Sequence, residues 1–240
     1  MEKLRVLVLG DGLLGTEIVK QTGWDYISRK KDGFDINDVE SFPSFFTEVF
    51  DGVAKIKYDV VINCIANTNT YSSNKEEHWN VNYVFVHNLI NTCNRLDIKL
   101  VHISTDYIYS GSIQNASETD VPVHCDNWYG YTKLLSDGLV QLVSNSYLLC
   151  RCMHKKNPFP YDSAWVDQIG NFDYVDVISS LIINLVDTES TGVYNVGTET
   201  KTMYQLASRT RTVNPINAPD KAPKNITMNI DKLNKKLDIK

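Results

Sequence analysis

The chain has 240 residues, of which 42% are hydrophobic and 22% are charged, and its formal net charge at pH 7 is -5. This length fits one large domain, or one domain with a small second lobe, and it excludes a string of unrelated domains. The mildly negative charge and the lack of a sustained Lys/Arg tract argue against nucleic acid or a membrane surface as a partner.

The first apolar run of the chain, at 4–9, indicates a strand that is buried on both faces of a parallel sheet. It leads directly into the sequence GDGLLG at 10–15, and residues 16–21 then have helical character. Glycines in a G-x-G-x-x-G turn between a strand and a helix let the backbone approach a pyrophosphate at the helix N-terminus. The alternative is a plain strand-turn-helix connection. We expect a dinucleotide site formed by Gly10, Gly12, Leu13, Leu14 and Gly15.

The second strand, predicted at 24–27, ends in a basic turn that bears on the choice of nicotinamide cofactor. An acidic residue at this place binds the ribose 2′-hydroxyl of NAD, whereas a basic residue accommodates the 2′-phosphate of NADP. The residues here are Ser28, Arg29 and Lys30. We expect them to bind the cofactor, with NADP preferred and NAD as the alternative. The other interpretation is a solvated basic turn.

Strands and helices continue to alternate along the first half of the chain. The apolar patterns predict strands at 58–65, 98–104 and 147–152, helical segments at 45–53 and 79–96, and a further helix that carries Tyr129. A polar loop at 111–127 precedes that last helix. The alternation is typical of an α/β fold with a Rossmann-type doubly wound parallel sheet.

The alternation weakens after Arg151, where two prolines fall within 155–161. The patterns that follow predict a helix at 175–186, a strand at 193–196, a helix at 203–210 and a loop at 213–223. We expect an NAD(P)-binding Rossmann domain at 1–151 and a small substrate-binding lobe at 152–240, part of whose chain can return to the Rossmann sheet.

The cysteines and the N-terminus bear on the compartment and on metal binding. The five cysteines, an odd number in mostly apolar surroundings, suit reduced thiols in the cytoplasm rather than a disulfide framework. The N-terminal apolar run is too short for a membrane span and has no cleavage-site pattern. No spacing of cysteines or histidines matches a metal site, and we expect Cys150 and Cys152 to be core residues of a strand.

The stretch NWYGYTKLL at 127–135 contains a candidate acid. Tyr129 and Lys133 stand four residues apart, so their side chains share one face of a helix. An ammonium group near a phenol favours the phenolate and lowers the phenol pKa from its usual value of about 10. The result would be a proton donor at neutral pH. The same spacing recurs in tyrosine-lysine pairs at 26/30 and 71/75, which we assign to chance.

Short motifs along almost the whole chain carry a resemblance to a known family. Ser104-Thr105-Asp106 ends a predicted strand, where ligands bind in an open parallel sheet, and YGYTK follows at 129–133. With these motifs the chain resembles the extended short-chain dehydrogenase/reductases, and most closely the dTDP-4-dehydrorhamnose reductase branch. The other matching stretches are GDGLLG (10–15), FDIND (34–38), DVVINCIANT (59–68), NVNY (80–83), HISTDYIYSG (102–111), ETDVP (118–122), FDYVDV (172–177), GVYNVG (192–197) and, weakly, PKNITMNIDKL (223–233).

The resemblance implies a catalytic trio of Thr105, Tyr129 and Lys133. Tyr129 would protonate the carbonyl oxygen of the substrate as hydride arrives from the nicotinamide. Lys133 would lower the pKa of Tyr129 and hold the cofactor ribose, and Thr105 would hydrogen-bond the same oxygen. Donors already in place suit an alkoxide that develops at this carbon. The alternatives are an ordinary strand-end hydroxyl for Thr105 and a turn cap for Asp106.

The resemblance also implies further binding residues. Asp35 and Ile36 would flank the adenine. The residues expected to line the cofactor groove are Asn63, Cys64, Ile65, Ala66 and Asn82. The residues expected to bind the substrate are Thr68, Thr105, Asp106 and Tyr107.

The chain departs from the family pattern in its second half. After the strand that ends at Arg151 the family usually has a Ser-Trp-Val-Tyr segment that reaches the sugar, whereas this chain reads Cys152-Met153-His154-Lys155. The segment from there to FDYVDV is shortened, and Ala222 stands where the family usually has an arginine. The identity of the sugar and of the nucleotide therefore stays open.

The resemblance implies a cytoplasmic, NADPH-dependent reductase that acts on the C4 keto group of a nucleotide-linked 4-keto-6-deoxysugar, as in rhamnose biosynthesis. Its expected partner is the nucleotide-sugar substrate, and a homodimer is a candidate assembly. One alternative is an NAD-dependent nucleotide-sugar epimerase or dehydratase of the same fold. Another is a non-catalytic, NADP-binding regulatory subunit, like the one of methionine adenosyltransferase.

Overall fold

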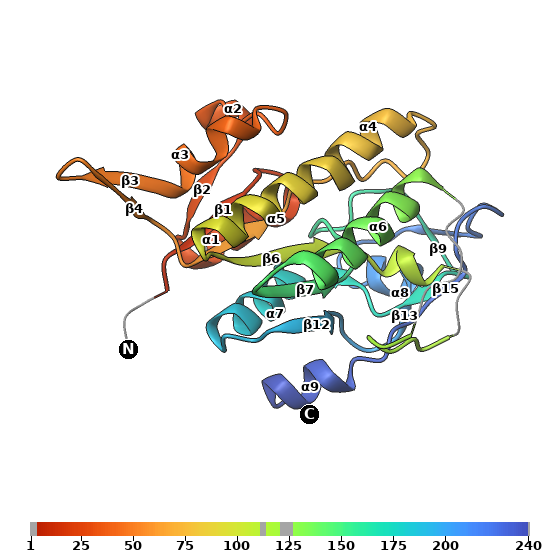
Figure 1. Ribbon diagram of the computed structural model, residues 1–240. Helices are drawn as coiled ribbons and strands as arrows, with labels where there is room; N and C mark the ends of the chain where they lie inside the picture. The colour runs from red at the N-terminus through yellow and green to blue at the C-terminus, as the bar shows by residue number, and fades with distance from the viewer. Residues whose placement is uncertain (1–3, 111–113, 121–126, 240) are drawn as a thin grey trace.

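The computed structural model describes residues 4–110, 114–120 and 127–239, which include a six-stranded sheet with helices on both faces (Figure 1). The strand order is β12-β7-β6-β5-β1-β2, and all neighbouring strands in this sheet pair in parallel. The predicted α/β class, a Rossmann-type doubly wound parallel sheet, is confirmed. The strands are β1 (Val6–Leu9), β2 (Asp25–Ile27), β5 (Val60–Asn63), β6 (Lys99–Ser104), β7 (Tyr147–Arg151) and β12 (Gly192–Asn195).

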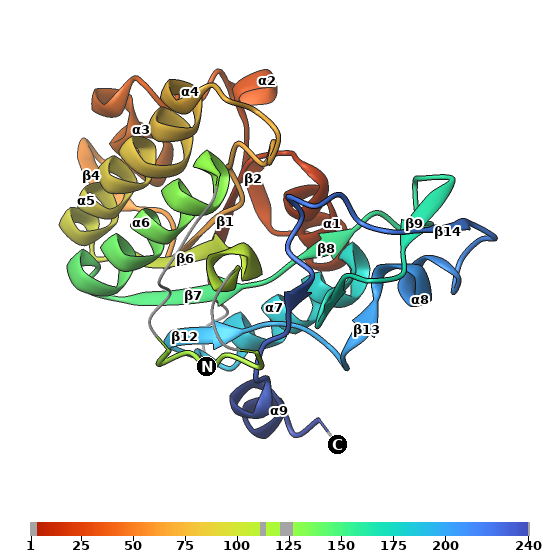
Figure 2. The same cartoon turned by 90° about the vertical axis from the view of Figure 1, so that its right-hand side faces the viewer.

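Helices cover both faces of this sheet because its strands carry apolar side chains on both sides. The covering helices are α1 (Leu13–Thr22), α3 (Phe42–Phe46), α4 (Lys75–Trp79), α5 (Phe85–Leu96), α6 (Trp128–Val143) and α7 (Val175–Asp187). Side chains alternate between the faces of a strand. Val6 and Val8 of β1 accordingly pack in a core with α1 and α7, and Leu7 and Leu9 pack in a second core with α3, α5 and α6. Figure 2 shows these two groups of helices on opposite sides of the sheet.

The helix predicted at 79–96 begins earlier in the structure. Asn74 caps α4 by accepting a hydrogen bond from the Glu77 amide at 3.2 Å. A π-helical turn at Asn80–Val84 then joins α4 to α5 without a break in the chain's helical path. No helix among the described residues combines the length and apolar character needed to cross a bilayer.

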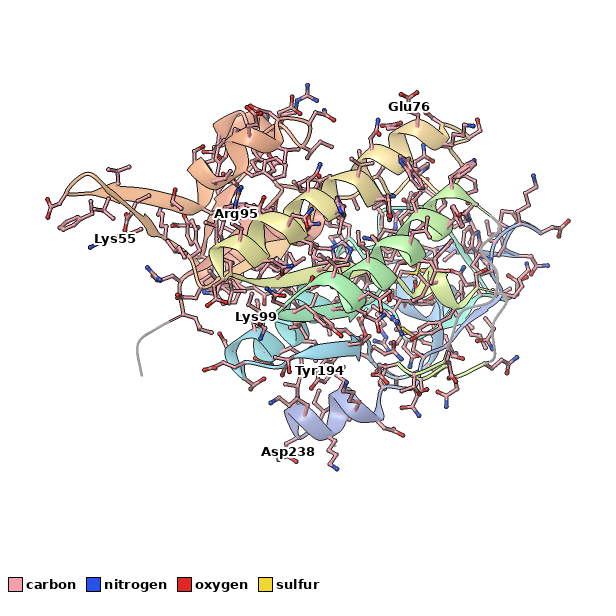
Figure 3. All side chains as sticks on the ribbon, viewed as in Figure 1. Lys55, Glu76, Arg95, Lys99, Tyr194 and Asp238 are labelled. Atoms are coloured by element: carbon pink, nitrogen blue, oxygen red, sulfur yellow. The ribbon has the colours of Figure 1, made fainter. Side chains whose placement is uncertain are left out.

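The helical segment predicted at 45–53 is wrong. The short helix α3 ends at Phe46, and the chain then forms an antiparallel hairpin of β3 (Thr47–Phe50) and β4 (Val53–Ile56). Asp51 and Gly52 form the turn with φ of 50° and 76°. An Asp-Gly pair between two strands is a strong hairpin signal because both residues tolerate positive φ. The hairpin lies outside the parallel sheet and projects from the body of the molecule, as Figure 3 shows around Lys55.

The second half of the chain contributes both to the central sheet and to a separate lobe. β12 pairs with β7 at the end of the sheet, while the lobe has its own core around Phe159, Phe172 and Met203. β14 lies within 213–223, where the sequence predicts a loop. The elements of the lobe are β8 (His154–Lys155), β9 (Ser163–Trp165), β10 (Ile169–Gly170), β11 (Asp173–Tyr174), β13 (Lys201–Thr202), α8 (Met203–Ala207), β14 (Asn214–Ile216) and β15 (Asn225–Ile226). The last helix, α9 (Asp231–Leu237), returns to the central sheet, where Leu233 joins the core that α1 and α7 cover.

The cysteines that the structure describes are free thiols. Cys150 lies on β7 and Cys152 directly follows it, and both are buried in the core that α1 and α7 cover, which confirms their predicted core role. Cys125 and part of the loop predicted at 111–127 lie outside the described residues.

Candidate active site

The glycine turn connects β1 to α1, and its three glycines serve different purposes. Gly10 has φ of 97°, a conformation that suits glycine. A Cβ atom on Gly15 would lie 2.1 Å from the Gly10 carbonyl oxygen, so the turn closes only because residue 15 is glycine. A Cβ atom on Gly12 would meet nothing within 4 Å. Gly12 therefore leaves open space beside the first turn of α1, where unpaired backbone N–H groups favour an anion.

The basic turn after β2 lies beside the glycine turn. The Gly10 amide donates to the Ile27 carbonyl at 2.9 Å, which joins the end of β2 to the start of the turn. Ser28 accepts a hydrogen bond from the Lys31 amide at 3.1 Å and so caps a short helix, α2 (Arg29–Asp32). The Arg29 and Lys30 side chains are exposed.

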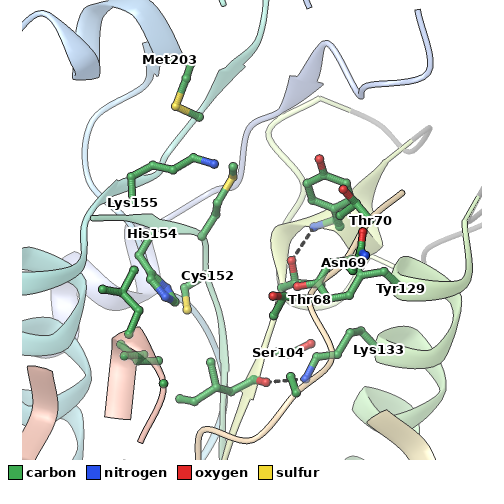
Figure 4. A pocket seen from close by; sticks show the side chains of 18 of the residues that line it. Thr68, Asn69, Thr70, Ser104, Tyr129, Lys133, Cys152, His154, Lys155 and Met203 are labelled. Atoms are coloured by element: carbon green, nitrogen blue, oxygen red, sulfur yellow. Dashed lines mark hydrogen bonds between the residues drawn. The ribbon is translucent and has the colours of Figure 1, made fainter. Parts of the chain in front are cut away.

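Helix α6 carries the predicted acid. Its N-cap, Asn127, accepts a hydrogen bond from the Gly130 amide at 2.8 Å, which fixes the first turn of the helix. Figure 4 shows that Tyr129 and Lys133 project from this helix toward one cavity. Tyr131 does not line that cavity, and its side chain is 43% exposed. The sequence prediction that Tyr129 and Lys133 share a helix face is confirmed.

The cavity has a volume of about 750 Å³ and extends from the glycine turn to the C-terminal lobe. This volume lies within the usual range for small-molecule and cofactor sites. The predicted site residues that line it are Gly12, Leu13, Leu14, Cys64, Ala66, Thr68, Thr105, Tyr107, Tyr129 and Lys133. Residues from the ends of β1, β5 and β6 thus meet residues of α6 at the carboxyl edge of the sheet, where ligands bind in open α/β folds.

Other predicted site residues lie outside the cavity lining. Asn82 is fully buried, accepts a hydrogen bond from the Asn67 amide at 2.8 Å and donates to the Asn67 carbonyl at 3.0 Å, so it anchors the loop that follows β5. Asp35 accepts a hydrogen bond from the Asn37 amide at 3.0 Å in an exposed turn. The predicted residues that do not line the cavity are Gly10, Gly15, Ser28, Arg29, Lys30, Asp35, Ile36, Asn63, Ile65, Asn82 and Asp106.

Lys133 is held by backbone and by a buried histidine. Its Nζ donates to the Ile103 carbonyl at 2.6 Å and lies 3.4 Å from Nε2 of His102. Burial lowers the pKa of Lys133 to about 8, against the carboxylate of Asp137, which raises it. The ammonium form is therefore less strongly favoured here than on an exposed lysine.

Both ring nitrogens of His102 face N–H groups. The Asn63 Oδ1 atom accepts a hydrogen bond from the Ile65 amide at 3.0 Å, so the Asn63 amide nitrogen faces Nδ1 of His102 at 3.3 Å, while Lys133 Nζ faces Nε2. Because a neutral imidazole has one acceptor nitrogen, it accepts a hydrogen bond from only one of these two neighbours. Burial also lowers the pKa of His102 well below its usual value, which keeps the ring neutral.

The expectation that Lys133 lowers the pKa of Tyr129 is wrong for this arrangement. Burial raises the pKa of Tyr129, and a hydrogen bond with the Thr105 side chain only partly opposes that shift. The Lys133 ammonium contacts Ile103 and His102 instead of the phenol. The Tyr129 phenol consequently keeps its proton throughout the neutral range.

Thr105 and Asp106 form a turn at the end of β6. Thr105 accepts a hydrogen bond from the Tyr107 amide at 3.2 Å and donates to Asp106 Oδ1 at 3.3 Å. Asp106 is fully buried, and its Oδ2 atom has no hydrogen-bond partner among the described residues. Burial raises the pKa of Asp106 to about 7. The ring of Tyr107 packs edge-on against Tyr129, with ring centroids 5.7 Å apart.

Sequence reasoning missed the residues that close the far side of the cavity. One group follows β5 in the chain, two residues end β6, and a larger group comes from the segment after β7 and from the C-terminal lobe. The missed lining residues are Asn69, Thr70, Tyr71, Ile103, Ser104, Cys152, Met153, His154, Lys155, Phe159, Tyr161, Ser163, Ala164, Trp165 and Met203. The departure of residues 152–155 from the family pattern was the one signal in the sequence that pointed to this side.

Comparisons with known proteins identify the family of this chain. The sequence matches the family described as the RmlD substrate binding domain over residues 4–154. The chain is 31% identical over 148 residues to the dTDP-4-dehydrorhamnose reductase of Mycolicibacterium smegmatis, and 26% identical over 183 residues to the spore coat polysaccharide biosynthesis protein SpsK of Bacillus subtilis. These matches cover 57% and 74% of this chain and span 41% and 58% of the length of those relatives, respectively.

The fold is similar to that of solved structures over almost the whole chain. The structure of a dTDP-4-dehydrorhamnose reductase from Bacillus anthracis in complex with NADP superposes with a TM-score of 0.79 at 21% identity, covering 98% of this chain and 92% of that one. A hypothetical dTDP-4-dehydrorhamnose reductase from Sulfolobus tokodaii superposes with a TM-score of 0.77 at 22% identity, covering 97% and 94% of the two chains. Since the family match includes the glycine turn, the strand-end threonine and the Tyr129-Lys133 pair, this chain belongs to the RmlD substrate binding domain family of dTDP-4-dehydrorhamnose reductase-like proteins.

Proposed function

We propose that this protein is an NADPH-dependent reductase of the C4 keto group of a nucleotide-linked 4-keto-6-deoxysugar. The observation that supports the proposal most is the meeting of Thr105, Tyr129 and Lys133 in one cavity, which the glycine turn also lines. A phenol, an ammonium group and a hydroxyl beside a dinucleotide site are the groups that carbonyl reduction needs.

The residues near the glycine turn fit a dinucleotide. The open space at Gly12 lets a pyrophosphate approach the backbone, and the first turn of α1 supplies N–H donors. The exposed Arg29 and Lys30 side chains would meet the 2′-phosphate of NADP. Lys133 would hold the ribose next to the nicotinamide. When bound, NADPH supplies the hydride.

Side chains of the protein supply the proton and the hydrogen bonds to the substrate oxygen. Tyr129 donates its phenolic proton to the C4 oxygen as negative charge develops there, and its hydrogen bond with Thr105 opposes part of the rise in pKa that burial causes. Thr105 lies in the same wall, and its 3.3 Å bond to Asp106 is long enough for a substrate oxygen to replace it.

The proposal extends to the organisation of the chain and its surroundings. We assign 1–151 to cofactor binding and 152–240 to substrate binding, because residues of the lobe line the side of the cavity away from the glycine turn. The substrate is a nucleotide sugar. The buried free thiols support a reducing compartment, the cytoplasm.

The first prediction is that Tyr129→Phe abolishes turnover while cofactor binding survives. Loss of a general acid should lower kcat by a factor of about 10² to 10⁴. The assay is NADPH oxidation with dTDP- or UDP-4-keto-6-deoxyglucose, prepared enzymatically and supplied with and without a 3,5-epimerase. NADPH binding, followed by the fluorescence of the nicotinamide, should stay within about twofold of the wild type.

Tyr131→Phe is the matched control, because Tyr131 lies on the same helix outside the cavity. It should reduce the ketone at the wild-type rate. A Tyr129→Phe variant as active as the control would contradict the mechanism. Tightly held NAD extracted from the purified protein would point instead to an epimerase or dehydratase, which recycles its hydride.

A further inference from the structure

The cavity wall carries positive charge. The described residues that line the cavity include two lysines, Lys133 and Lys155, and no aspartate or glutamate. His154 also lines the wall, but burial and the neighbouring Lys155 lower its pKa to about 4, so its ring is neutral at pH 7. A wall of this kind favours a ligand that carries negative charge.

The two lysines differ in what they already bind. Lys133 donates to the Ile103 carbonyl at 2.6 Å and lies near the glycine turn side of the cavity. The Lys155 side chain makes no hydrogen bond or ion pair with any residue in the described part of the chain. Burial lowers the pKa of Lys155, and the charge of Asp106, which does not line the cavity, opposes part of that shift.

The position of Lys155 directs its charge into the cavity. It is the last residue of β8, which pairs with β11 and thus belongs to a paired element of the lobe rather than to a mobile surface loop. Figure 4 shows its ammonium group extended across the cavity, toward the side that carries Thr68, Thr70 and Tyr129. The side chain is partly buried, so its charge is screened less than that of an exposed lysine.

Lys155 departs from the segment that the family resemblance implies here. It lies one residue beyond the family match, which ends at His154. The Ser-Trp-Val-Tyr segment of the family pattern would place a tyrosine where this chain has Lys155. A neutral hydroxyl is thereby replaced by a point charge with three donors, which suits an oxyanion.

We propose that Lys155 binds an oxyanion of the nucleotide-sugar substrate and thereby determines which substrates the cavity accepts. The oxyanion is either the diphosphate or a carboxylate on the sugar, because both present the same charged oxygens to an ammonium group. The inference rests on the proposed function in taking a nucleotide sugar as the ligand. It adds the residue that recognises the anionic part of that ligand.

The experiment measures binding, not turnover, so that it is independent of the reductase assay. Affinities for dTDP-glucose, UDP-glucose and UDP-glucuronic acid are determined by calorimetry, with and without saturating NADP⁺. The variants are Lys155→Met, which keeps the length of the side chain and removes the charge, and Lys155→Arg, which keeps the charge. The matched control is Lys156→Met, because the neighbouring Lys156 is exposed and outside the cavity lining.

The wild type should bind at least one of these probes, and Lys155→Met should weaken that binding about tenfold or more, as expected for loss of a charge-assisted hydrogen bond. Lys155→Arg should retain part of the affinity, and Lys156→Met should match the wild type. Equal losses for all three probes would identify the diphosphate as the group bound. A loss confined to UDP-glucuronic acid would identify the sugar carboxylate.

Two results would overturn the inference. One is a Lys155→Met variant that melts at the wild-type temperature and binds every probe as tightly as Lys156→Met does. The other is a wild type that binds none of the probes. A failure of the reductase proposal is different, because it would leave probe binding sensitive to Lys155 while no keto-sugar oxidised NADPH.

Discussion

At the scale of single residues, the candidate site contains ionisable side chains whose pKa values are shifted by burial. Lys133 donates to a backbone carbonyl, and Asp106 has a buried oxygen with no hydrogen-bond partner among the described residues. Burial favours the neutral form of each group, lowering the pKa of Lys133 to about 8 and raising that of Asp106 to about 7. Groups shifted in this way are typical of functional sites, and they also make stability depend on pH.

The prediction at this scale concerns Asp106→Asn. The pKa of Asp106 is about 7 in the folded chain and about 3.9 when unfolded, so between these values the folded state binds more protons. The free energy of unfolding should therefore fall as pH rises from about 4 to about 7. Asparagine cannot ionise and escapes this loss. The variant should be more stable than the wild type at pH 8 by roughly 2–4 kcal/mol, at about 1.4 kcal/mol per pKa unit.

Urea unfolding of both proteins at pH 5 and pH 8 checks this prediction. The stability difference between Asp106→Asn and the wild type should be clearly larger at pH 8 than at pH 5. The exposed Asp220→Asn serves as control and should show no such change between the two pH values. A difference that is the same at both pH values would mean that Asp106 ionises in the fold as it does in water.

At the scale of elements, two glycines in the turn from β1 to α1 are expected to have different roles. Gly15 is needed for the fold, and Gly12 for binding of the ligand. Gly15→Ala should destabilise the protein by more than about 1–3 kcal/mol, since its Cβ would lie 2.1 Å from the Gly10 carbonyl oxygen and the backbone would have to move. Gly12→Ala should leave the melting temperature nearly unchanged, because φ of -69° suits alanine and no atom lies within 4 Å of its Cβ. It should nevertheless weaken NADPH binding, because the added methyl group occupies the space for the pyrophosphate.

Thermal melts and NADPH titrations of the two variants provide the measurement. Each variant controls for the other, because both replace a glycine of one turn by alanine. Normal NADPH affinity in a folded Gly12→Ala protein would show that the pyrophosphate does not approach this turn.

At the scale of the whole molecule, the second half of the chain completes the sheet and the core that the first half begins. β12 extends the sheet beside β7, and α7 supplies much of the core that also contains Val6 and Val8. A buried network of an ion pair and hydrogen bonds also joins the two halves of the chain. In this network, Arg151 on β7 pairs with Asp137 on α6 at 2.9 Å. Arg151 also donates to Tyr109, whose hydroxyl donates to Asn195 on β12 at 3.0 Å.

This arrangement predicts that a fragment of residues 1–151 does not unfold cooperatively, because it lacks α7 and β12 and exposes the apolar side chains that they cover. A fragment of residues 1–197 restores both elements and should regain a cooperative transition at lower stability than the full chain. Urea unfolding followed by circular dichroism distinguishes the two fragments. A fragment of residues 1–151 that unfolds as sharply as the full chain would contradict this role for β12 and α7.

The sequence by itself determined the local parts of this protein. The β1 strand, the glycine turn and the shared helix face of Tyr129 and Lys133 depend on neighbouring residues, and each was predictable from its period or spacing. The hairpin at Thr47–Ile56 is also local, because its signal, Asp51-Gly52 between two short segments with β-branched and aromatic residues, lies within the hairpin itself.

Only the tertiary structure decided the composition of the cavity and the charge state of its residues. Lys155 lies on β8 in the second half of the chain, yet the fold brings it to the same cavity as Tyr129 on α6, and no periodicity predicts such a meeting. The direction of the Tyr129 pKa shift likewise reversed, because burial and the course of the Lys133 side chain are properties of packing rather than of spacing.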